Sequence, residues 1–471
     1  MKILLPLLTL SAALFAGTTS NQTDELTPIL PPDALPFEIA IEVSDFQLPI
    51  GLQSFVYATY DNKWLLLAGR VNGMHGFNPT NNFPPRAQNG NIYVVDPVRK
   101  TVVSRSLTDP SSGLSQAQIE TLSVTAPQYT QSGSTLYMVG GYGFDSATGS
   151  FSTKSTLTAI DVPGLISWVE GSKGKAVNSM RQTSHPLLQV TGGFLTRTAP
   201  HQPFLLIFGQ SFTGAYTGSG AGYTQVYTQQ VRPFQLIDNG TDLYIKPGKE
   251  FPRNPNYRRR DLSVLPIVQQ SGNSYSLGVV ALSGVFTLDA GVWTVPVLIN
   301  GDGTSLMPSP SDPNTFKQGM NNYDCARTGL FSKERNEMYM LLFGGISYLT
   351  VSGGSFVPDS EDPFINSVTT VQIDAQGSFH QYLMENEYPL ILSPFGDIGH
   401  PLLFGAEARF ITANTLPTFP NGVFSFDALG SSRILLGHIV GGIQSSQANN
   451  SAPLIDSAAS PYIFSVYLQR R

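Results

Sequence analysis

The sequence predicts an all-β protein built from repeated strand units, and three observations support this fold class. A short apolar strand that ends at glycine recurs six times along the chain. The 471 residues include 45 Gly and 34 Pro, as expected of a chain with many turns. Charged residues make up only 13% of the sequence, about half the usual share of ~25%. Similar segments at a regular spacing indicate stacked supersecondary units, although this length would otherwise suggest two or more domains.

The six apolar strands share a run of large apolar residues followed by glycine, where a residue without a Cβ turns easily. They are Trp64–Arg70, Leu136–Gly143, Phe204–Gln210, Leu277–Gly284, Met338–Gly345 and Leu435–Gly442. A second strand follows each one, and several of these alternate apolar and polar residues before Asp and a turn, which is typical of a hairpin strand. These strands are Asn91–Pro97, Thr156–Gly164, Thr228–Asp238, Val292–Ile299, Thr369–Gly377 and Tyr462–Leu468.

The order of elements in each unit resembles the Kelch repeat of β-propellers. An apolar strand ends at a glycine pair, a loop follows, and a second strand then ends in Asp before a turn. The resemblance extends from about Leu52 to the C-terminus. The glycine pair is complete in Gly140–Gly141, Gly344–Gly345 and Gly441–Gly442, whereas Gly69, Gly209 and Gly284 stand alone. The pattern is also similar to secreted bacterial Kelch-like proteins of uncharacterised activity. The resemblance implies a single β-propeller with six four-stranded blades, or seven if Phe379–Leu403 contains a degenerate unit.

The repeats also predict how the two ends of the chain meet. The last repeat ends with one strand, Tyr462–Leu468, and therefore lacks an outer strand, while Phe37–Val43 is an unassigned strand near the N-terminus. Pairing these two strands would close the ring and remove exposed sheet edges. The predicted blades are Leu52–Leu107, Glu120–Glu170, Thr183–Ile245, Arg259–Ile299, Cys325–Leu383, and His400–Leu468 with Phe37–Val43.

The N-terminus has the features of a secretory signal. Lys2 precedes the apolar run Ile3–Phe15, and small residues follow at 16–20, so residues 1–20 are predicted to be a cleaved signal peptide. The alternative is a membrane anchor, but this run is shorter than the ~20 residues that cross a bilayer. We expect a Pro-rich linker at 21–36 and the propeller at 37–471. The chain would then be secreted, periplasmic or held at the cell surface, with no stable membrane span.

Net charge and cysteine content limit which classes of partner and which cellular compartment suit the chain. The net charge is −6, and the only cationic cluster is Arg258–Arg260, so nucleic acid is an unfavourable partner. Cys325 is the single cysteine, which excludes an intrachain disulfide and fits bacterial export. Because NYDCARTGLF leads into an apolar strand without an adjacent His, we expect Cys325 to be a buried, inert thiol.

Long loops follow the glycine strands in five repeats. Equivalent loops of a propeller emerge on one face, so these segments should gather on one side and form a binding surface. Neutral growth of loops in an extracellular protein is the alternative. The loops are Arg70–Gly90, Gly141–Ser155, Gly209–Gln225, Gly345–Ser367 and Gly442–Ser460.

Candidate ligand-binding residues come from the same positions and from the cationic cluster. Guanidinium groups suit carboxylates or sulfate, and polar side chains after the glycine strands would lie near the top of a central channel. The alternatives are that the arginines pair with Asp261 and nearby acids, and that the polar groups bond to neighbouring blades. The candidates are Arg70, His75, Gln210, Arg258, Arg259, Arg260, Ser347 and Gln444.

No sequence motif identifies a reaction. The histidines form no metal-binding spacing, no phosphate or dinucleotide loop lies before a helix, and neither a metal nor a cofactor is predicted. The copper chemistry of galactose oxidase, which shares a Kelch-type propeller, would need a partner set that Cys325 lacks. The acidic candidates for proton transfer are Asp261, Asp324, Asp397 and Glu407, although sequence alone cannot show a catalytic pair.

Three functions are consistent with these observations. The leading one is an exported binding module that recognises a glycan or an extracellular protein through the long-loop face. The second is a carbohydrate-active enzyme, such as a sugar epimerase or lyase, with its site in the central funnel. It would require an Arg and a Glu or His together in that funnel. The third is a structural part of a surface assembly.

Overall fold

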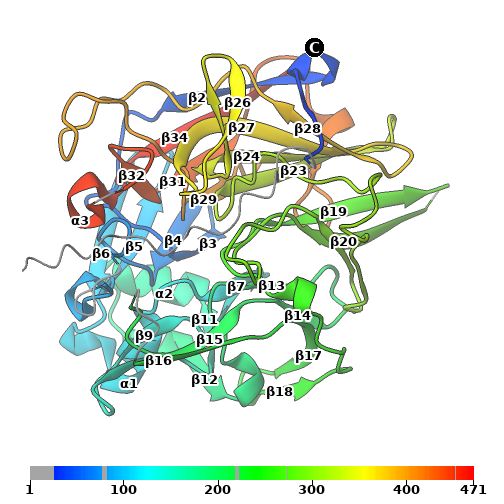
Figure 1. Cartoon of the computed structure of the whole chain (residues 1–471). Helices are drawn as coiled ribbons and strands as arrows, with labels where there is room; N and C mark the ends of the chain where they lie inside the picture. The colour runs from blue at the N-terminus through cyan, green and yellow to red at the C-terminus, as the bar shows by residue number, and fades with distance from the viewer. Residues whose placement is uncertain (1–25, 77–81, 218–221, 273, 451) are drawn as a thin grey trace, which may run out of the picture.

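The computed structural model describes residues 26–76, 82–217, 222–272, 274–450 and 452–471 (Figure 1). The predicted signal peptide lies outside the described residues, as do parts of the first, third and fifth long loops. β-Strands are the main regular structure of the described chain and its helices are few and short, as the sequence predicts. Within these residues no helix is long and apolar enough to cross a membrane.

Six antiparallel units of four strands make up most of the structure, and in Figure 1 they follow one another around the molecule in sequence order. Unit 1 is β3 (Val56–Tyr60), β4 (Lys63–Leu67), β5 (Asn91–Asp96) and β6 (Thr101–Ser106). Unit 2 is β7 (Gln128–Ser132), β8 (Thr135–Val139), β11 (Thr156–Asp161) and β12 (Met180–Ser184). Unit 3 is β13 (Phe194–Thr196), β14 (Phe204–Ile207), β17 (Val231–Asp238) and β18 (Leu243–Pro247).

The remaining units have the same strand order. Unit 4 is β19 (Val264–Ser271), β20 (Ser274–Ala281), β21 (Val297–Asn300) and β22 (Ser305–Leu306). Unit 5 is β23 (Ala326–Ser332), β24 (Glu337–Ile346), β27 (Phe364–Ile373) and β28 (Phe379–Leu383), widened by β1 (Ile29–Leu30) and β30 (Phe424–Ser425). Unit 6 is β29 (Arg409–Thr412), β31 (Ile434–Val440), β34 (Ile463–Arg470) and β2 (Phe37–Val43).

The N-terminal strand completes the last unit. β2 pairs antiparallel with β34 over its whole length, from Phe37 opposite Arg470 to Val43 opposite Phe464. In Figure 1 the blue β2 lies beside the red end of the chain. The predicted pairing of Phe37–Val43 with the C-terminal strand is therefore confirmed.

Hydrophobic clusters lie between neighbouring units, because alternate residues of a central strand face opposite sides of its sheet. In β4, Leu65 and Leu67 pack toward unit 2, while Trp64 and Leu66 pack toward unit 6. The cluster between units 6 and 1 also contains Ile411, Val440 and Ile463. Further clusters join units 2 and 3, 3 and 4, 4 and 5, and 5 and 6.

The boundaries of units 2 and 3 differ from the sequence prediction. The fourth strand of unit 2 is β12, which begins at Met180, whereas the sequence assigned Thr183 to unit 3. The short helix α2 (Val162–Val169), capped by Asp161, separates β11 from β12 and displaces this outer strand along the chain. Residues 384–408 contain isolated bridges but no named strand, so Phe379–Leu403 does not hold a further four-stranded unit.

The segment predicted to be a linker packs against unit 5. Ile29 and Leu30 pair in parallel with Gln381 and Tyr382 of β28. Pro32 begins a 3-10 turn, Pro32–Ala34, and Leu35 is buried. Residues 26–36 are therefore part of the folded body in this structure.

The long loops gather on one face and contact one another, as the sequence predicts. Those of units 2 and 3 form a shared sheet of β9 (Tyr142–Asp145), β10 (Ser150–Thr153), β15 (Gln210–Gly214) and β16 (Tyr223–Tyr227). The loop of unit 5 contains the hairpin β25 (Leu349–Ser352) and β26 (Ser355–Pro358), and that of unit 6 contains β32 (Ile443–Ser445), α3 (Pro453–Asp456) and β33 (Ser457–Ala459). Cross-contacts join Asn82 to Tyr216, Met74 to Ser457 and Asp359 to Asn449.

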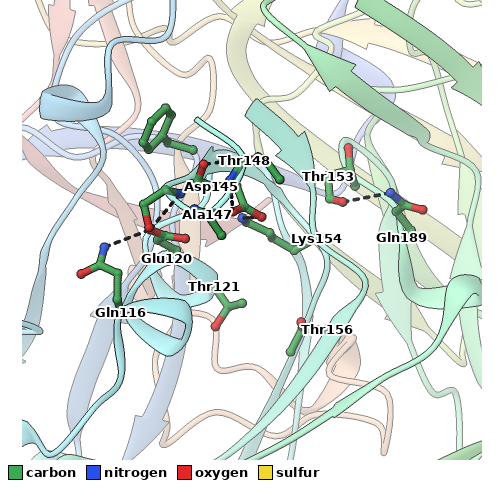
Figure 2. Close-up of polar contacts among 12 residues, drawn as sticks. Gln116, Glu120, Thr121, Asp145, Ala147, Thr148, Thr153, Lys154, Thr156 and Gln189 are labelled. Carbon is green, nitrogen blue, oxygen red and sulfur yellow. Dashed lines mark hydrogen bonds and ion pairs between the residues drawn. The ribbon is translucent and has the colours of Figure 1, made fainter. Parts of the chain in front are cut away.

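Polar side chains fix the loop of unit 2 to the rest of the chain (Figure 2). Helix α1 (Gln116–Leu122) supplies Glu120, whose Oε1 accepts hydrogen bonds from Gln116 Nε2 at 2.9 Å and from Ser146 N at 3.2 Å. Within the hairpin itself, Lys154 Nζ lies 3.2 Å from Asp145 Oδ2. The contacts of Glu120 therefore tie the turn between β9 and β10 to helix α1, and the ion pair braces the hairpin.

Candidate functional site

Two cavities lie at the centre of the six units. The one beneath the long loops, here called the loop-side cavity, has a volume of about 180 Å³. The other, called the hairpin-side cavity, has a volume of about 790 Å³ and is lined by residues from the first strand of every unit. Both are lined by Ala126, Gly192, Asp261, Asp324 and Glu407. These shared residues therefore lie between the two cavities.

The shared residues belong to a sixfold set, one from each unit, which we call the inner ring. Each lies two or three residues before the first strand of its unit and has a left-handed backbone. The members are Ser54 (φ 53°), Ala126 (46°), Gly192 (66°), Asp261 (50°), Asp324 (47°) and Glu407 (58°). Asp261, Asp324 and Glu407 come from the consecutive units 4, 5 and 6, so one half of the ring is acidic and the other is small and uncharged.

A backbone contact repeated in every unit positions two further sets of residues around the loop-side cavity. The residue before each inner-ring member bonds to the residue that follows the glycine of the central strand. The six contacts are Gln53–Arg70, Thr125–Tyr142, Thr191–Gln210, Arg260–Val285, Tyr323–Ile346 and Ala406–Ile443. All twelve of these residues line the loop-side cavity.

The glycine of the central strand is needed because the strand passes over the segment before the inner ring. At Gly69 the φ is +84°, and a Cβ would lie 2.3 Å from the carbonyl oxygen of Gln53. Gly345 has a φ of +92°, and its Cβ would lie 2.9 Å from Cys325 Cβ. Steric contact therefore requires glycine at the second position of each pair. The first position tolerates a side chain, since Ala68 and Phe208 occupy it with positive φ in units 1 and 3.

Aromatic side chains from the loops complete the wall of the loop-side cavity. His75 lies with its ring centroid 4.9 Å from those of both Phe83 and Tyr216. Tyr216 packs on Phe212 at 5.3 Å, and the Arg70 guanidinium carbon lies 4.6 Å from the Phe83 centroid. This wall offers ring faces of the kind that hold flat, partly apolar ligands.

Charged groups form the floor of the same cavity. Arg260 Nη1 lies 2.6 Å from Asp261 Oδ2, and Arg260 also donates from Nε to the Tyr227 hydroxyl at 3.1 Å. Arg409 lies on the other side of the floor, with Nη1 3.8 Å from Asp324 Oδ1 and Nη2 3.8 Å from Glu407 Oε2. Within the described residues, Glu407 Oε2 is buried and has no hydrogen-bond partner.

Burial changes the protonation of this floor. Burial and the nearby carboxylate of Asp324 raise the pKa of Glu407 well above its ordinary value. Burial raises the pKa of Asp261 to about 6, although Arg260 opposes the shift. Burial lowers the pKa of His75 to about 4, so its ring is neutral. The floor therefore combines one carboxyl group with a strongly raised pKa and a second, Asp261, that titrates near pH 6.

The predicted candidates divide into two groups. Arg70, His75, Gln210 and Arg260 line the loop-side cavity. Of the acidic candidates, Asp261, Asp324 and Glu407 come together at its floor. Asp397 is remote from the floor, lying on an exposed loop 3.4 Å from His400. An arginine and a glutamate are thus present together at the centre, as the enzyme hypothesis requires.

Ser347 and Gln444 do not line either cavity, and the reason is a displacement of one residue. The positions equivalent to Arg70 and Gln210 are Ile346 and Ile443, which follow directly after the second glycine. One residue later the side chain points to the other side of an extended chain. Ser347 is fully buried, where it accepts a hydrogen bond from Asn321 N and donates one to Leu349 O.

Arg258 and Arg259 also lie outside the cavity linings. Arg259 is fully buried and donates hydrogen bonds to the carbonyl oxygens of Asn256, Leu282 and Val295 at 3.1, 2.9 and 2.8 Å. Arg258 bonds to the carbonyl of Thr287 at 3.0 Å and stacks on Tyr227. These two arginines support the wall of unit 4, and only the third residue of the cluster reaches the cavity.

Sequence reasoning missed the aromatic wall and the inner ring as a set. Ser, Ala, Gly, Asp, Asp and Glu share no side-chain property, and only their backbone conformation relates them. The available signal was their position shortly before each first strand. Among the described residues no group of three or more His, Cys, Asp or Glu has an arrangement suited to a metal ion.

The six units with their shared centre define a protein with the sheet arrangement of a β-propeller. No protein-family model matches the chain, and no curated protein is significantly similar to it. Among solved structures, that described as "Structure of YjhT" matches with a TM-score of 0.43 and 9% sequence identity, covering 90% of this chain and 99% of the other.

Proposed function

We propose that this chain is an exported, closed six-bladed propeller of the Kelch type that binds a small saccharide in its loop-side cavity. Closure is supported by the pairing of β2 with β34 and by the hydrophobic cluster between units 6 and 1. The glycine strands support the Kelch relationship. Export rests on the signal-like N-terminus and is tested by locating the protein in cell fractions.

The observation that carries the binding proposal is the combination of aromatic walls with a charged floor in one small cavity. Its volume of about 180 Å³ is below the ~300–1,000 Å³ of sites for drug-sized ligands, which favours one or two sugar rings over a protein partner. Tyr216 and Phe83 offer ring faces to C–H groups, while Arg260, Asp261 and Gln210 offer donors and acceptors to hydroxyl groups.

The direct test is saccharide binding by the chain from residue 21, measured by saturation-transfer NMR and calorimetry over a panel of neutral and acidic sugars. Tyr216→Ala should weaken binding by about tenfold or more, because stacking and shape are lost together. Arg99→Gln, at a side chain that is 79% exposed, serves as the control. Failure of every sugar to bind, or equal binding by the Tyr216→Ala protein, would contradict the proposal.

A second function, acid–base catalysis on the bound sugar, is favoured by the protonation of the floor. Glu407 can donate a proton, and Asp261, with a pKa of about 6, can accept one. Such a pair suits epimerisation or lyase chemistry. Glu407→Gln should then abolish turnover, followed by NMR of the sugar, while affinity falls by only a few-fold. If the wild-type protein binds sugars but does not convert them, the catalytic hypothesis is wrong and the function is binding alone.

A further inference from the structure

Guanidinium groups in the hairpin-side cavity lack a close carboxylate partner among the described residues. The lining of this cavity includes Arg197, Arg327 and Arg409 from units 3, 5 and 6. Within the described residues neither Arg197 nor Arg327 makes an ion pair, and Arg409 approaches carboxylate oxygens only at 3.8 Å. Unpaired charges in a partly enclosed site are costly unless another group compensates them.

Hydrogen bonds to the backbone hold the two central guanidinium groups in place. Arg327 donates from Nε to Val264 O at 2.9 Å and from Nη1 to Cys325 O at 2.8 Å. Arg409 donates from Nε to Phe55 O at 3.0 Å and from Nη1 to Ala408 O at 3.1 Å. Each arginine thus reaches the inner strand of a neighbouring unit, and neither can swing out to solvent without losing these bonds.

The two guanidinium groups are close enough to repel each other. Burial lowers the pKa of Arg327; Cys325 and the charge of Asp324 oppose this shift, and the charge of Arg409 adds to it. Tyr129 lies with them, since its hydroxyl interacts with Arg409 and its ring centroid is 5.6 Å from that of Tyr57. The carbon of the Arg327 guanidinium lies 5.7 Å from the Phe194 centroid, so the group extends across the cavity from unit 5 toward unit 3.

Counting charges around the shared floor gives a positive excess. Arg197, Arg260, Arg327 and Arg409 contribute four formal positive charges around the floor and the cavity wall. The carboxyl groups there are those of Asp261, Asp324 and Glu407. Even with all three counted as negative the balance is +4 − 3 = +1, and Asp261 is already held by Arg260 on the other side of the floor.

We propose that the hairpin-side cavity is a second ligand site, which binds a small oxyanion through Arg327 and Arg409 with Tyr129 as an additional donor. Planar guanidinium groups match the paired oxygens of carboxylate, phosphate or sulfate. This site is distinct from the saccharide site, since it opens on the opposite side of the inner ring and shares only the floor with it. It does not depend on the saccharide proposal.

The test is calorimetric titration of the chain from residue 21 with acetate, inorganic phosphate and sulfate at constant ionic strength, with chloride as the reference anion. If acetate is the only anion that binds, the site is specific for carboxylates. If phosphate or sulfate binds, the site accepts tetrahedral oxyanions. Arg327→Gln should weaken the binding by about tenfold or more, because a charge-assisted pair of bonds is lost. Arg99→Gln, an exposed arginine, should leave the affinity unchanged.

A second variant separates ligand binding from support of the fold. Asp324→Asn removes the carboxylate that competes for Arg409, so it should tighten anion binding by about threefold or more. A merely destabilised protein would not gain affinity, and this result stands even if Arg327→Gln fails to fold. Binding of none of the three anions, unchanged binding in Arg327→Gln, or weaker or unchanged binding in Asp324→Asn would each overturn the proposal.

Discussion

The backbone N–H of Ser54 donates a hydrogen bond to the carbonyl oxygen of Glu407 at 3.2 Å and so links unit 1 directly to unit 6. Similar bonds run from Glu407 N to Asp324 O at 2.7 Å and from Asp261 N to Gly192 O at 2.9 Å. The inner ring is therefore joined through its own backbone. The same residues that connect the units also carry the carboxyl groups of the candidate site, so site chemistry and stability are coupled.

Replacing Glu407 by Gln should stabilise the protein increasingly as the pH rises. The pKa of Glu407 is raised above its unfolded value of about 4.5, so the folded state binds more protons than the unfolded state above that pH. Wild-type stability from this group is fully present below pH ~4.5 and is lost as pH rises toward the folded pKa. Gln keeps the neutral shape without this loss.

The measurement is chemical denaturation of both proteins between pH 4 and 9. The difference in unfolding free energy, Glu407→Gln minus wild type, should be near zero or slightly negative at pH 4 and become more positive at pH 9, at up to ~1.4 kcal/mol per pH unit. Glu250→Gln, at an exposed carboxylate without an ion pair among the described residues, should show no such trend. A difference that stays constant with pH would mean that Glu407 is ionised in the native state.

Deleting residues through Val43 should destabilise the fold far more than deleting residues through Pro32. The longer deletion removes β2, with its buried side chains Phe37, Ile39 and Ile41, each worth ~1.5–3 kcal/mol. Their sum of ~5–9 kcal/mol is comparable to the net stability of a typical domain. It also exposes the edge of β34 to other chains.

The shorter deletion removes the two-residue strand β1 with its contacts to β28, the hydrogen bonds of Thr27 with Lys317, and the packing of Leu26 and Ile29. Because far less buried surface is lost than with β2, the melting temperature should fall by a few degrees. A chain that begins at residue 26 is the reference for both. Thermal melting and light scattering follow the comparison. Equal melting of the two truncated proteins would show that pairing of β2 with β34 is not needed to close the ring.

The repeated features of this fold were predictable because local rules determine them. Glycine at the exit of each central strand is required by positive φ and close backbone approach, so all six units were found from sequence. The role of Phe37–Val43 followed from counting strands. The outer strand of unit 2 was misplaced because helix α2 breaks the spacing, and no repeat rule anticipates such an insertion.

The site was only partly predictable because it depends on register and on the backbone. Arg70, Gln210 and Arg260 line the loop-side cavity; the first two were proposed from their repeat positions and the third from the cationic cluster, and their binding role stays a prediction. Ser347 and Gln444 were misplaced by one residue, and a shift of one residue in an extended segment reverses the direction of the side chain. Phe83 and Tyr216 reach the cavity from long loops, whose folding no periodic pattern determines.

Arg259 should prove to be a structural residue whose loss lowers stability. Arg259→Met would leave the carbonyl oxygens of Leu282 and Val295 without their buried donors, and each unsatisfied group costs ~1–3 kcal/mol. We expect the unfolding free energy to fall by ~3 kcal/mol or more, measured by urea denaturation. Exposed Arg99→Gln should change it by less than ~0.5 kcal/mol. A small change for Arg259→Met would indicate that unit 4 repacks around the shorter side chain.

Cys325 should react slowly with thiol reagents in the native protein, although it belongs to the lining of the hairpin-side cavity. The residue is fully buried, with Sγ 3.8 Å from Ser263 Oγ, and burial raises the pKa of the thiol to about 11. The reactive thiolate is therefore scarce at neutral pH, because the nearby Arg327 only partly opposes the effect of burial.

Labelling with a chromogenic disulfide at pH 8 should accordingly be at least ~100-fold slower in buffer than in denaturant. Serine at this position keeps the size of the side chain and removes the thiol, so Cys325→Ser is the control for labelling elsewhere. Saturating sulfate or phosphate should slow native labelling further, because a ligand on Arg327 blocks the approach through the cavity. Rapid native labelling would show that the inner strand of unit 5 opens readily, and it would make the rigid arrangement of Arg327 and Asp324 untenable.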